Sequence, residues 1–266
     1  MTRSSVRRAF SDGSLWARPT PRAPRLIGHR GASAQCPENS LEAFRRAASD
    51  GADGVELDVL RCATGEVVVF HDDDLGRLGG RPDRIASLSL AAIRQVRLAS
   101  GASIPTLEEA LEACGDELLV NVELKASGVS GSEIRRLVDG VAAVVGSPGV
   151  RERVLVSSFH PCAVAAWQRR VPEIPAGLLF EAEAPLYLRR AWALPWLRPF
   201  SANPQDLLCE TEAVRRWHAR GYRVNVWTVD APDDLRRLAA AGVDAIITND
   251  PARARLALAD LSARPS

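Results

Sequence analysis

Short runs rich in β-branched residues alternate with Ala-, Leu- and Arg-rich stretches from residue 25 almost to the C-terminus. This alternation predicts βα units, in which parallel strands form a sheet that helices cover. Nine runs are strand candidates: 25–29, 54–59, 67–70, 118–124, 154–159, 176–180, 200–203, 223–228 and 244–248. A closed barrel of this class needs eight strands, so one run requires a separate explanation.

The second and third runs supply that explanation. Only seven residues separate Val59 from Val67, which is too short for the crossover between two parallel strands. A turn at 63–65 instead closes an antiparallel hairpin, with a register that places His71 opposite Asp58. The sequence therefore predicts an α/β fold, a TIM-type (β/α)8 barrel with an antiparallel hairpin after strand 2 and its chemistry at the carboxyl ends of the strands.

Chain length and composition favour one domain. The 266 residues are 46% hydrophobic, enough for a single barrel over 25–260. Residues 1–24, rich in Arg, Ser and Pro, are expected to form a flexible N-terminal extension. Arg7-Arg8 weakly resembles a twin-arginine export signal, but no apolar region follows it. The formal charge of +1 gives no whole-molecule attraction to nucleic acid.

The five cysteines form no CxxC pair, and their number is odd. This pattern argues against both a disulfide framework and a zinc site, and it favours a reducing, cytoplasmic location. No run is long enough to span a membrane. The Trp-containing segment 191–200 could touch a membrane surface, although a loop between a strand and a helix is the favoured interpretation.

Ionisable residues gather where the predicted strands end. Residues i and i+2 of a strand point the same way, so Glu56 and Asp58 share one face, as do Glu123 and Lys125. If both faces are the barrel interior, three carboxylates repel one another unless a cation lies between them. Oxygen ligands suit a hard divalent ion, and we expect one Mg²⁺ or Ca²⁺.

Each of these residues also has an ordinary explanation. An isolated E-x-D is common on an exposed strand, a lone histidine at a strand end is commonly structural, and a Glu near a Lys is commonly a simple ion pair. Their joint appearance at one rim of the predicted barrel, together with His29, Arg30 and His71, favours a functional site.

The stretch "GHRGASAQCPENSLEAFRRAASDGADGVELDVLRCATGEVVVFHDDDLGR" resembles the signature of the glycerophosphodiester phosphodiesterase family. The later pieces "IPTLEEAL", "NVELK", "VSSF", "GYRVNVWTVD" and "GVDAIITNDP" are similar to the downstream motifs of that family, in the same order. The resemblance covers residues 25–255. One departure is "PENS", where the family usually has PENT; the Ser keeps a hydroxyl that can cap a helix.

The resemblance implies a metal-dependent phosphodiesterase. Such an enzyme hydrolyses glycerophosphodiesters, which are deacylated phospholipids, to sn-glycerol 3-phosphate and an alcohol. The matching positions imply the following roles: His29 and His71 as the acid/base pair, Glu56, Asp58 and Glu123 as metal ligands, Arg30 and Lys125 as phosphate-binding cations, and Trp227 as a wall of the glycerol pocket. The nucleophile is either a substrate hydroxyl, through a cyclic phosphate, or water.

Two other functions compete with this one. A phospholipase-D-like hydrolase of lysophospholipid or sphingomyelin shares the paired histidines and the carboxylate site, but a secreted enzyme of that kind is expected to carry an export signal and disulfides. A barrel that binds a phosphorylated metabolite without turning it over has no need of an acid/base pair. Both histidines and all three carboxylates are present here.

Overall fold

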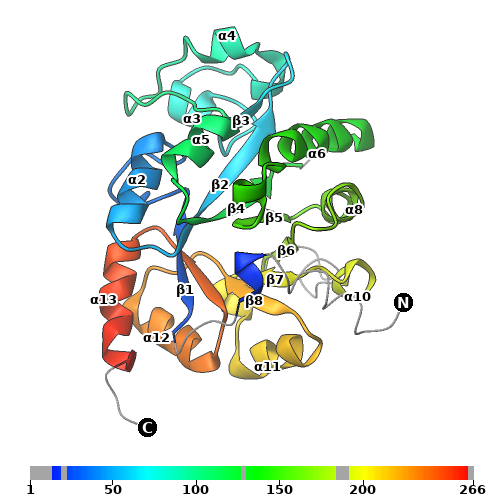
Figure 1. The fold of residues 1–266 in the computed structure, drawn as a ribbon. Helices are drawn as coiled ribbons and strands as arrows, with labels where there is room; N and C mark the ends of the chain where they lie inside the picture. Colours follow the sequence, from blue (N-terminus) through cyan, green and yellow to red (C-terminus); the bar gives the residue numbers. More distant parts are fainter. Residues whose placement is uncertain (1–13, 19–22, 127–129, 184–191, 263–266) are drawn as a thin grey trace.

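The computed structural model describes residues 14–18, 23–126, 130–183 and 192–262 (Figure 1). Its strands form one sheet in the order β1-β9-β8-β7-β6-β5-β4-β2-β3, and β1 also pairs with β2, which closes a ring of eight parallel strands. The strands are β1 (Arg25–His29), β2 (Gly54–Arg61), β3 (Val67–Val69), β4 (Leu119–Leu124), β5 (Val154–Ser158), β6 (Ala176–Phe180), β7 (Ser201–Pro204), β8 (Arg223–Val226) and β9 (Ala245–Thr248). The predicted TIM-type barrel is confirmed.

Helices surround the ring of strands (Figure 1). They are α2 (Leu41–Ser49), α3 (Gly76–Gly79), α4 (Leu90–Ile93), α5 (Leu107–Ala113), α6 (Gly131–Val145), α7 (Pro148–Arg151), α8 (Pro161–Arg170), α10 (Leu194–Leu197), α11 (Thr211–Ala219), α12 (Pro232–Ala241) and α13 (Pro251–Ser262), with the 3₁₀ turns η1 (Leu15–Ala17), η2 (Ile85–Ser87) and η3 (Asp206–Leu208). The buried side chains of α6 show the helical spacing: Ile134, Leu137, Val138, Val141 and Val145. Such a stripe packs a helix against the barrel.

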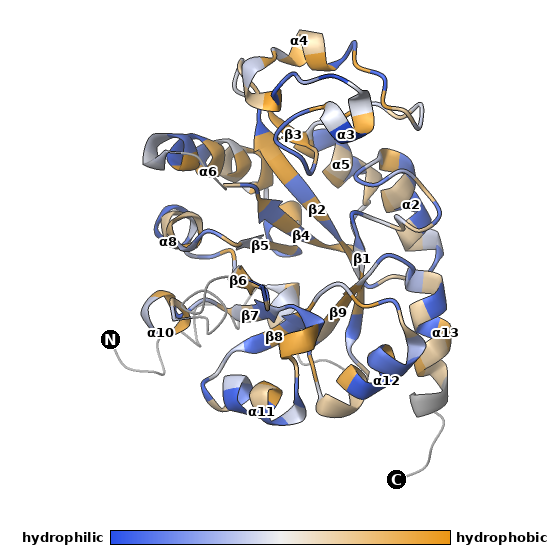
Figure 2. Ribbon diagram, turned by 180° about the vertical axis from the view of Figure 1, so that it is seen from behind, coloured by the Kyte–Doolittle hydropathy of each residue, from blue (hydrophilic) through white to orange (hydrophobic). Residues whose placement is uncertain are grey.

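Hydrophobic residues dominate the strands (Figure 2), as expected for a parallel sheet that is covered on its outer face. Strands β2 and β4 differ from this rule, because Glu56 and Asp58 are buried in β2 and Glu123 is buried in β4. Burying carboxylates is costly unless they are paired or bind a metal. These two strands therefore mark a part of the interior whose role is not packing alone.

The antiparallel hairpin is confirmed, but its predicted register is wrong by one residue. Val59 pairs with Val69, and the amide of Phe70, not that of His71, donates to the Asp58 carbonyl at 3.0 Å. The turn is centred on Thr64, since the Cys62 amide donates to the Glu66 carbonyl. Beyond β3, helices α3 and α4 form a lobe outside the ring (Figure 1) with its own small hydrophobic cluster.

A short N-terminal segment is docked on the barrel, a feature that the sequence analysis missed. Most of the predicted flexible extension lies outside the described residues, but Trp16 is only 2% exposed. It packs with Ile27 and Leu155, and its Nε1 donates to the Arg153 carbonyl at 2.8 Å. Arg25 donates to three carbonyls of the same segment. One buried Trp thus anchors η1.

Surface features bear on membrane contact. Among the described helices, none combines the length and the apolar character needed to cross a membrane. Trp192 and Trp196, which lie before and within α10, are 61% and 88% exposed.

Replacing Trp16 with Ala should lower the free energy of unfolding by about 3 kcal/mol, because a buried indole and its hydrogen bond are lost. Trp196→Ala is the matched control, and we expect it to stay within about 0.5 kcal/mol of the parent because the side chain is exposed. Urea denaturation followed by circular dichroism measures both. Equal stability of the two variants would show that η1 does not stabilise the barrel.

Candidate active site

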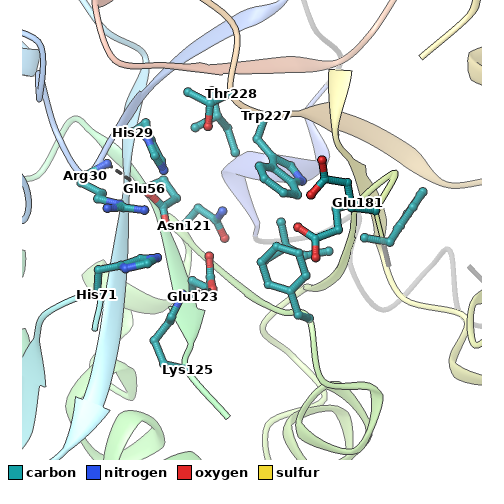
Figure 3. Close-up of a pocket in the computed structure, with 15 residues that line it drawn as sticks. His29, Arg30, Glu56, His71, Asn121, Glu123, Lys125, Glu181, Trp227 and Thr228 are labelled. Carbon is teal, nitrogen blue, oxygen red and sulfur yellow. Dashed lines mark hydrogen bonds and ion pairs between the residues drawn. The ribbon is translucent and has the colours of Figure 1, made fainter. Parts of the chain in front are cut away.

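The carboxyl ends of the barrel strands open on a cavity of about 720 Å³. Its lining includes seven of the eight site residues predicted from the sequence: His29, Arg30, Glu56, His71, Glu123, Lys125 and Trp227. The eighth, Asp58, lies beside this lining and is 1% exposed. Figure 3 shows His29, Glu56 and His71 on one side of the cavity and Trp227 on another. The strand-end residues therefore come together at one site.

Three buried carboxylates form the centre of this site. Glu56 and Asp58 lie on β2. Glu123 lies on the neighbouring strand β4, where it is the register partner of Asp58. Each can offer one oxygen so that the three oxygens lie within 4.8 Å of one another. The i, i+2 spacing in β2 and the parallel register of β2 and β4 place all three on the inner face.

This crowding disturbs the titration of the carboxyl groups. Burial raises the pKa of Glu56 well above its usual value, and the negative charges of Asp58 and Glu123 raise it further. Burial and Asp58 raise the pKa of Glu123 to about 7. Burial would also raise the pKa of Asp58, but Lys125 and Arg30 outweigh it and lower that pKa. Both raised pKa values have the same causes, which are burial first and the neighbouring negative charges second.

Two cations flank the carboxylates. Lys125 Nζ lies 2.9 Å from Glu123 Oε1 and 3.5 Å from Asp58 Oδ1. Arg30 Nε lies 3.2 Å from Asp58 Oδ2. These pairs neutralise the site only in part, because the buried Oε1 of Glu56 has no hydrogen-bond partner among the described residues.

Backbone geometry explains the "GHRG" motif at the end of β1. Arg30 has φ 55° and Gly31 has φ 83°, so the chain turns sharply where the strand stops. This turn directs the Arg30 amide to Glu56 Oε2 at 3.0 Å. A Cβ on Gly31 would lie 2.6 Å from the backbone of Ala43, so only glycine fits there.

The partners of the His29 ring were not foreseen. His29 Nδ1 lies 2.7 Å from Asn249 Oδ1, and the Asn249 amide is itself held because its Nδ2 donates to Asp230 Oδ2 at 2.6 Å. An amide oxygen only accepts, so Nδ1 carries the proton, and Nε2 has no partner in the described part of the chain. Burial, followed by the charge of Arg30, lowers the pKa of His29. At neutral pH the ring is therefore a base.

His71 is held by a carboxylate instead. Its Nδ1 lies 2.7 Å from Asp72 Oδ1, and Asp72 Oδ2 accepts from Arg77 at 2.7 Å. Arg77 also binds both oxygens of Glu38, and Glu38 accepts from Arg30. A continuous chain of charged hydrogen bonds thus joins His71 to the cation beside Asp58. As in His29, the second ring nitrogen has no hydrogen-bond partner among the described residues.

The "PENS" motif does more than cap a helix. Ser40 caps α2, as its side chain accepts from the Ala43 amide. Glu38 belongs to the ion-pair chain, and Asn39 Nδ2 donates to Asp58 Oδ2 at 2.8 Å. Asn39 occupies the left-handed region, with φ 56°. Interpreting "PENS" as a cap alone was therefore incomplete.

Aromatic and polar residues complete the cavity. Trp227 Nε1 donates to the Asn203 carbonyl at 2.8 Å, and its ring meets that of Phe159 edge to face at 5.2 Å. Asn121 and Glu181 also line the cavity, and neither was among the predicted site residues. Both could have been predicted from the sequence. Asn121 lies two residues before Glu123 on the same strand face, and Glu181 directly follows a predicted strand.

Comparison with known proteins agrees with this geometry. The chain is 32% identical over 235 residues to a glycerophosphodiester phosphodiesterase of Caldanaerobacter subterraneus, covering 85% of this chain and 94% of the relative. A solved phosphodiesterase of Oleispira antarctica, in complex with the product sn-glycerol-3-phosphate, matches with TM-score 0.79 and 27% identity over 89% of this chain and 97% of that one. The glycerophosphodiester phosphodiesterase of Thermotoga maritima matches with TM-score 0.71 and 29% identity over 86% and 96%.

The sequence model of the glycerophosphoryl diester phosphodiesterase family matches residues 29–253, which contain every predicted site residue. This match spans most of the barrel, from the end of β1 into α13. The chain therefore belongs to the glycerophosphoryl diester phosphodiesterase family.

Proposed function

We propose that residues 25–260 form one catalytic barrel that hydrolyses glycerophosphodiesters to sn-glycerol 3-phosphate and an alcohol. Membership of the family and the name of the Caldanaerobacter relative support this activity. The product complex of the Oleispira protein supports the choice of substrate. The five cysteines are free thiols, which favours a reducing compartment such as the cytoplasm.

The observation that carries the proposal is the buried cluster of Glu56, Asp58 and Glu123. The unpartnered Glu56 oxygen and the two raised carboxyl pKa values suit a site for a hard cation. We propose that these residues hold one divalent ion, Mg²⁺ or Ca²⁺. When bound, such an ion supplies Lewis-acid polarisation of substrate oxygens.

The chain's own groups supply the remaining chemistry. Arg30 and Lys125 lie beside the carboxylates, where they can hold the non-bridging phosphate oxygens. His29 and His71 present their free Nε2 atoms, which can remove a proton from the nucleophile and donate one to the leaving alkoxide. Trp227 is fixed by its hydrogen bond to Asn203 and can form a wall for the glycerol group.

This arrangement disfavours the competing functions. A barrel that only binds phosphate needs no pair of histidines whose rings are each fixed through Nδ1. The five cysteines are free, whereas a secreted phospholipase-D-like enzyme is expected to contain disulfides.

The direct test is the release of sn-glycerol 3-phosphate from glycerophosphocholine with Mg²⁺, with Ca²⁺ or with EDTA. We expect EDTA to abolish turnover, and His29→Ala or His71→Ala to lower kcat/KM by about 10²-fold or more through loss of proton transfer. His160→Ala is the control, because His160 caps α8 and does not line the cavity. Near-full activity of either site variant would refute the role of that histidine.

Asn249→Ala tests whether the hydrogen-bond partner of His29 matters. The variant removes the acceptor that fixes the ring, so we expect kcat to fall about tenfold, as for other residues that orient a catalytic group. Metal affinity should stay unchanged, since Asn249 forms no hydrogen bond with Glu56, Asp58 or Glu123. Steady-state kinetics and calorimetric metal titration measure the two effects. An unchanged kcat would show that burial alone orients His29.

A further inference from the structure

The cavity has a second wall that the phosphate chemistry does not use. Glu181 is the first residue after β6, and both Glu181 and Glu183 line the cavity. Figure 3 shows Glu181 pointing into the cavity from the side opposite His29 and His71. Negative charge therefore faces the centre from two directions.

The position of Glu181 is fixed by the barrel. The amide of the next residue, Ala182, donates to Gln205 Oε1 at 2.9 Å. The Gln205 amide donates in turn to the Phe180 carbonyl, also at 2.9 Å. The backbone on both sides of Glu181 is thus tied to Gln205, the residue that follows β7, and this places Glu181 at the rim.

Aromatic side chains surround this wall. The rings of Phe159 and Trp227 line the same cavity, whereas the ring of Phe180 packs edge to face against Trp217 of α11. The edge-to-face contact of Phe159 with Trp227 and the Trp227 hydrogen bond to Asn203 fix the two cavity rings. Aromatic faces and carboxylates together attract organic cations, quaternary ammonium groups above all.

The charges of this wall are not balanced by the described part of the chain. Neither Glu181 nor Glu183 forms an ion pair with a described residue, and the cavity cations Arg30 and Lys125 are bound to carboxylates across from them. A second, independent sign of a ligand is Asn121, which lines the cavity, is 2% exposed and has a buried Oδ1 without a partner among the described residues. In Figure 3 its amide lies between the two walls.

We propose that Glu181, Glu183 and the aromatic rings form the leaving-group subsite, and that this subsite selects glycerophosphodiesters whose alcohol carries a substituted ammonium group. This inference rests on the proposed function. The phosphate lies beside Arg30 and Lys125 and the ammonium group beside Glu181, so the cavity matches a zwitterion. A neutral alcohol leaves both glutamates unpaired, and an anionic one is repelled.

The first test compares two diesters with the metal-loaded enzyme. We expect wild-type kcat/KM to be higher for glycerophosphocholine than for glycerophosphoglycerol. The variant Glu181→Gln/Glu183→Gln should lose about tenfold on the choline diester, through lost ion-pair and cation–π attraction, and less than twofold on the glycerol diester. An equal loss on both substrates, or none, would overturn the inference.

Glu173→Gln is the matched control. It removes the same charge from an exposed residue that precedes β6 and so lies at the opposite end of that strand. We expect its ratio of kcat/KM for the two diesters to equal that of the wild type. A ratio lowered as much as in the double variant would mean that the overall charge of the protein, and not a subsite, sets the preference.

Choline binding separates this inference from the proposed function, because it needs no turnover. Calorimetric titration of choline into the metal-loaded protein should show binding that weakens about fivefold in the double variant. Such binding without hydrolysis of either diester would refute the proposed function while supporting the subsite. Absence of choline binding to the wild-type protein would overturn the subsite. A double variant that no longer binds its one divalent ion per chain would overturn it as well.

Discussion

The mutual repulsion of three buried carboxylates organises this end of the barrel. Glu56, Asp58 and Glu123 cannot all remain ionised inside a protein without nearby positive charge. The structure meets this need in part with Arg30 and Lys125, and the raised pKa values of Glu56 and Glu123 show that the need is not fully met. The divalent ion that we propose would complete the balance, and the same positive charge would then serve an anionic substrate.

The two histidines are held by different partners around this centre. His29 faces a neutral amide, and His71 faces a carboxylate that belongs to the ion-pair chain through Arg77 and Glu38. The structure therefore gives two rings of the same kind unlike surroundings, which suits the proton transfer in two directions that we propose.

Much of the fold could be predicted because it depends on local pattern. The alternation of apolar runs located all nine strands, and the i, i+2 rule located the inward carboxylates. The hairpin register was off by one because the centre of a short turn is ambiguous in sequence. The partners of the histidines could not be predicted, since His29 and Asn249 are 220 residues apart and meet only when the barrel closes. The buried Trp16 was missed because the apolar run around it is only three residues long and lies in a stretch rich in Arg, Ser and Pro.

Calorimetric titration of Mg²⁺ or Ca²⁺ tests the central claim, that the buried carboxylates form a metal site. The account predicts one ion per chain, with affinity at least about tenfold weaker in Glu123→Gln. The matched variant Glu133→Gln, which changes an exposed glutamate at the start of α6, should bind as the parent does. Absence of binding, or equal affinity in both variants, would contradict the account.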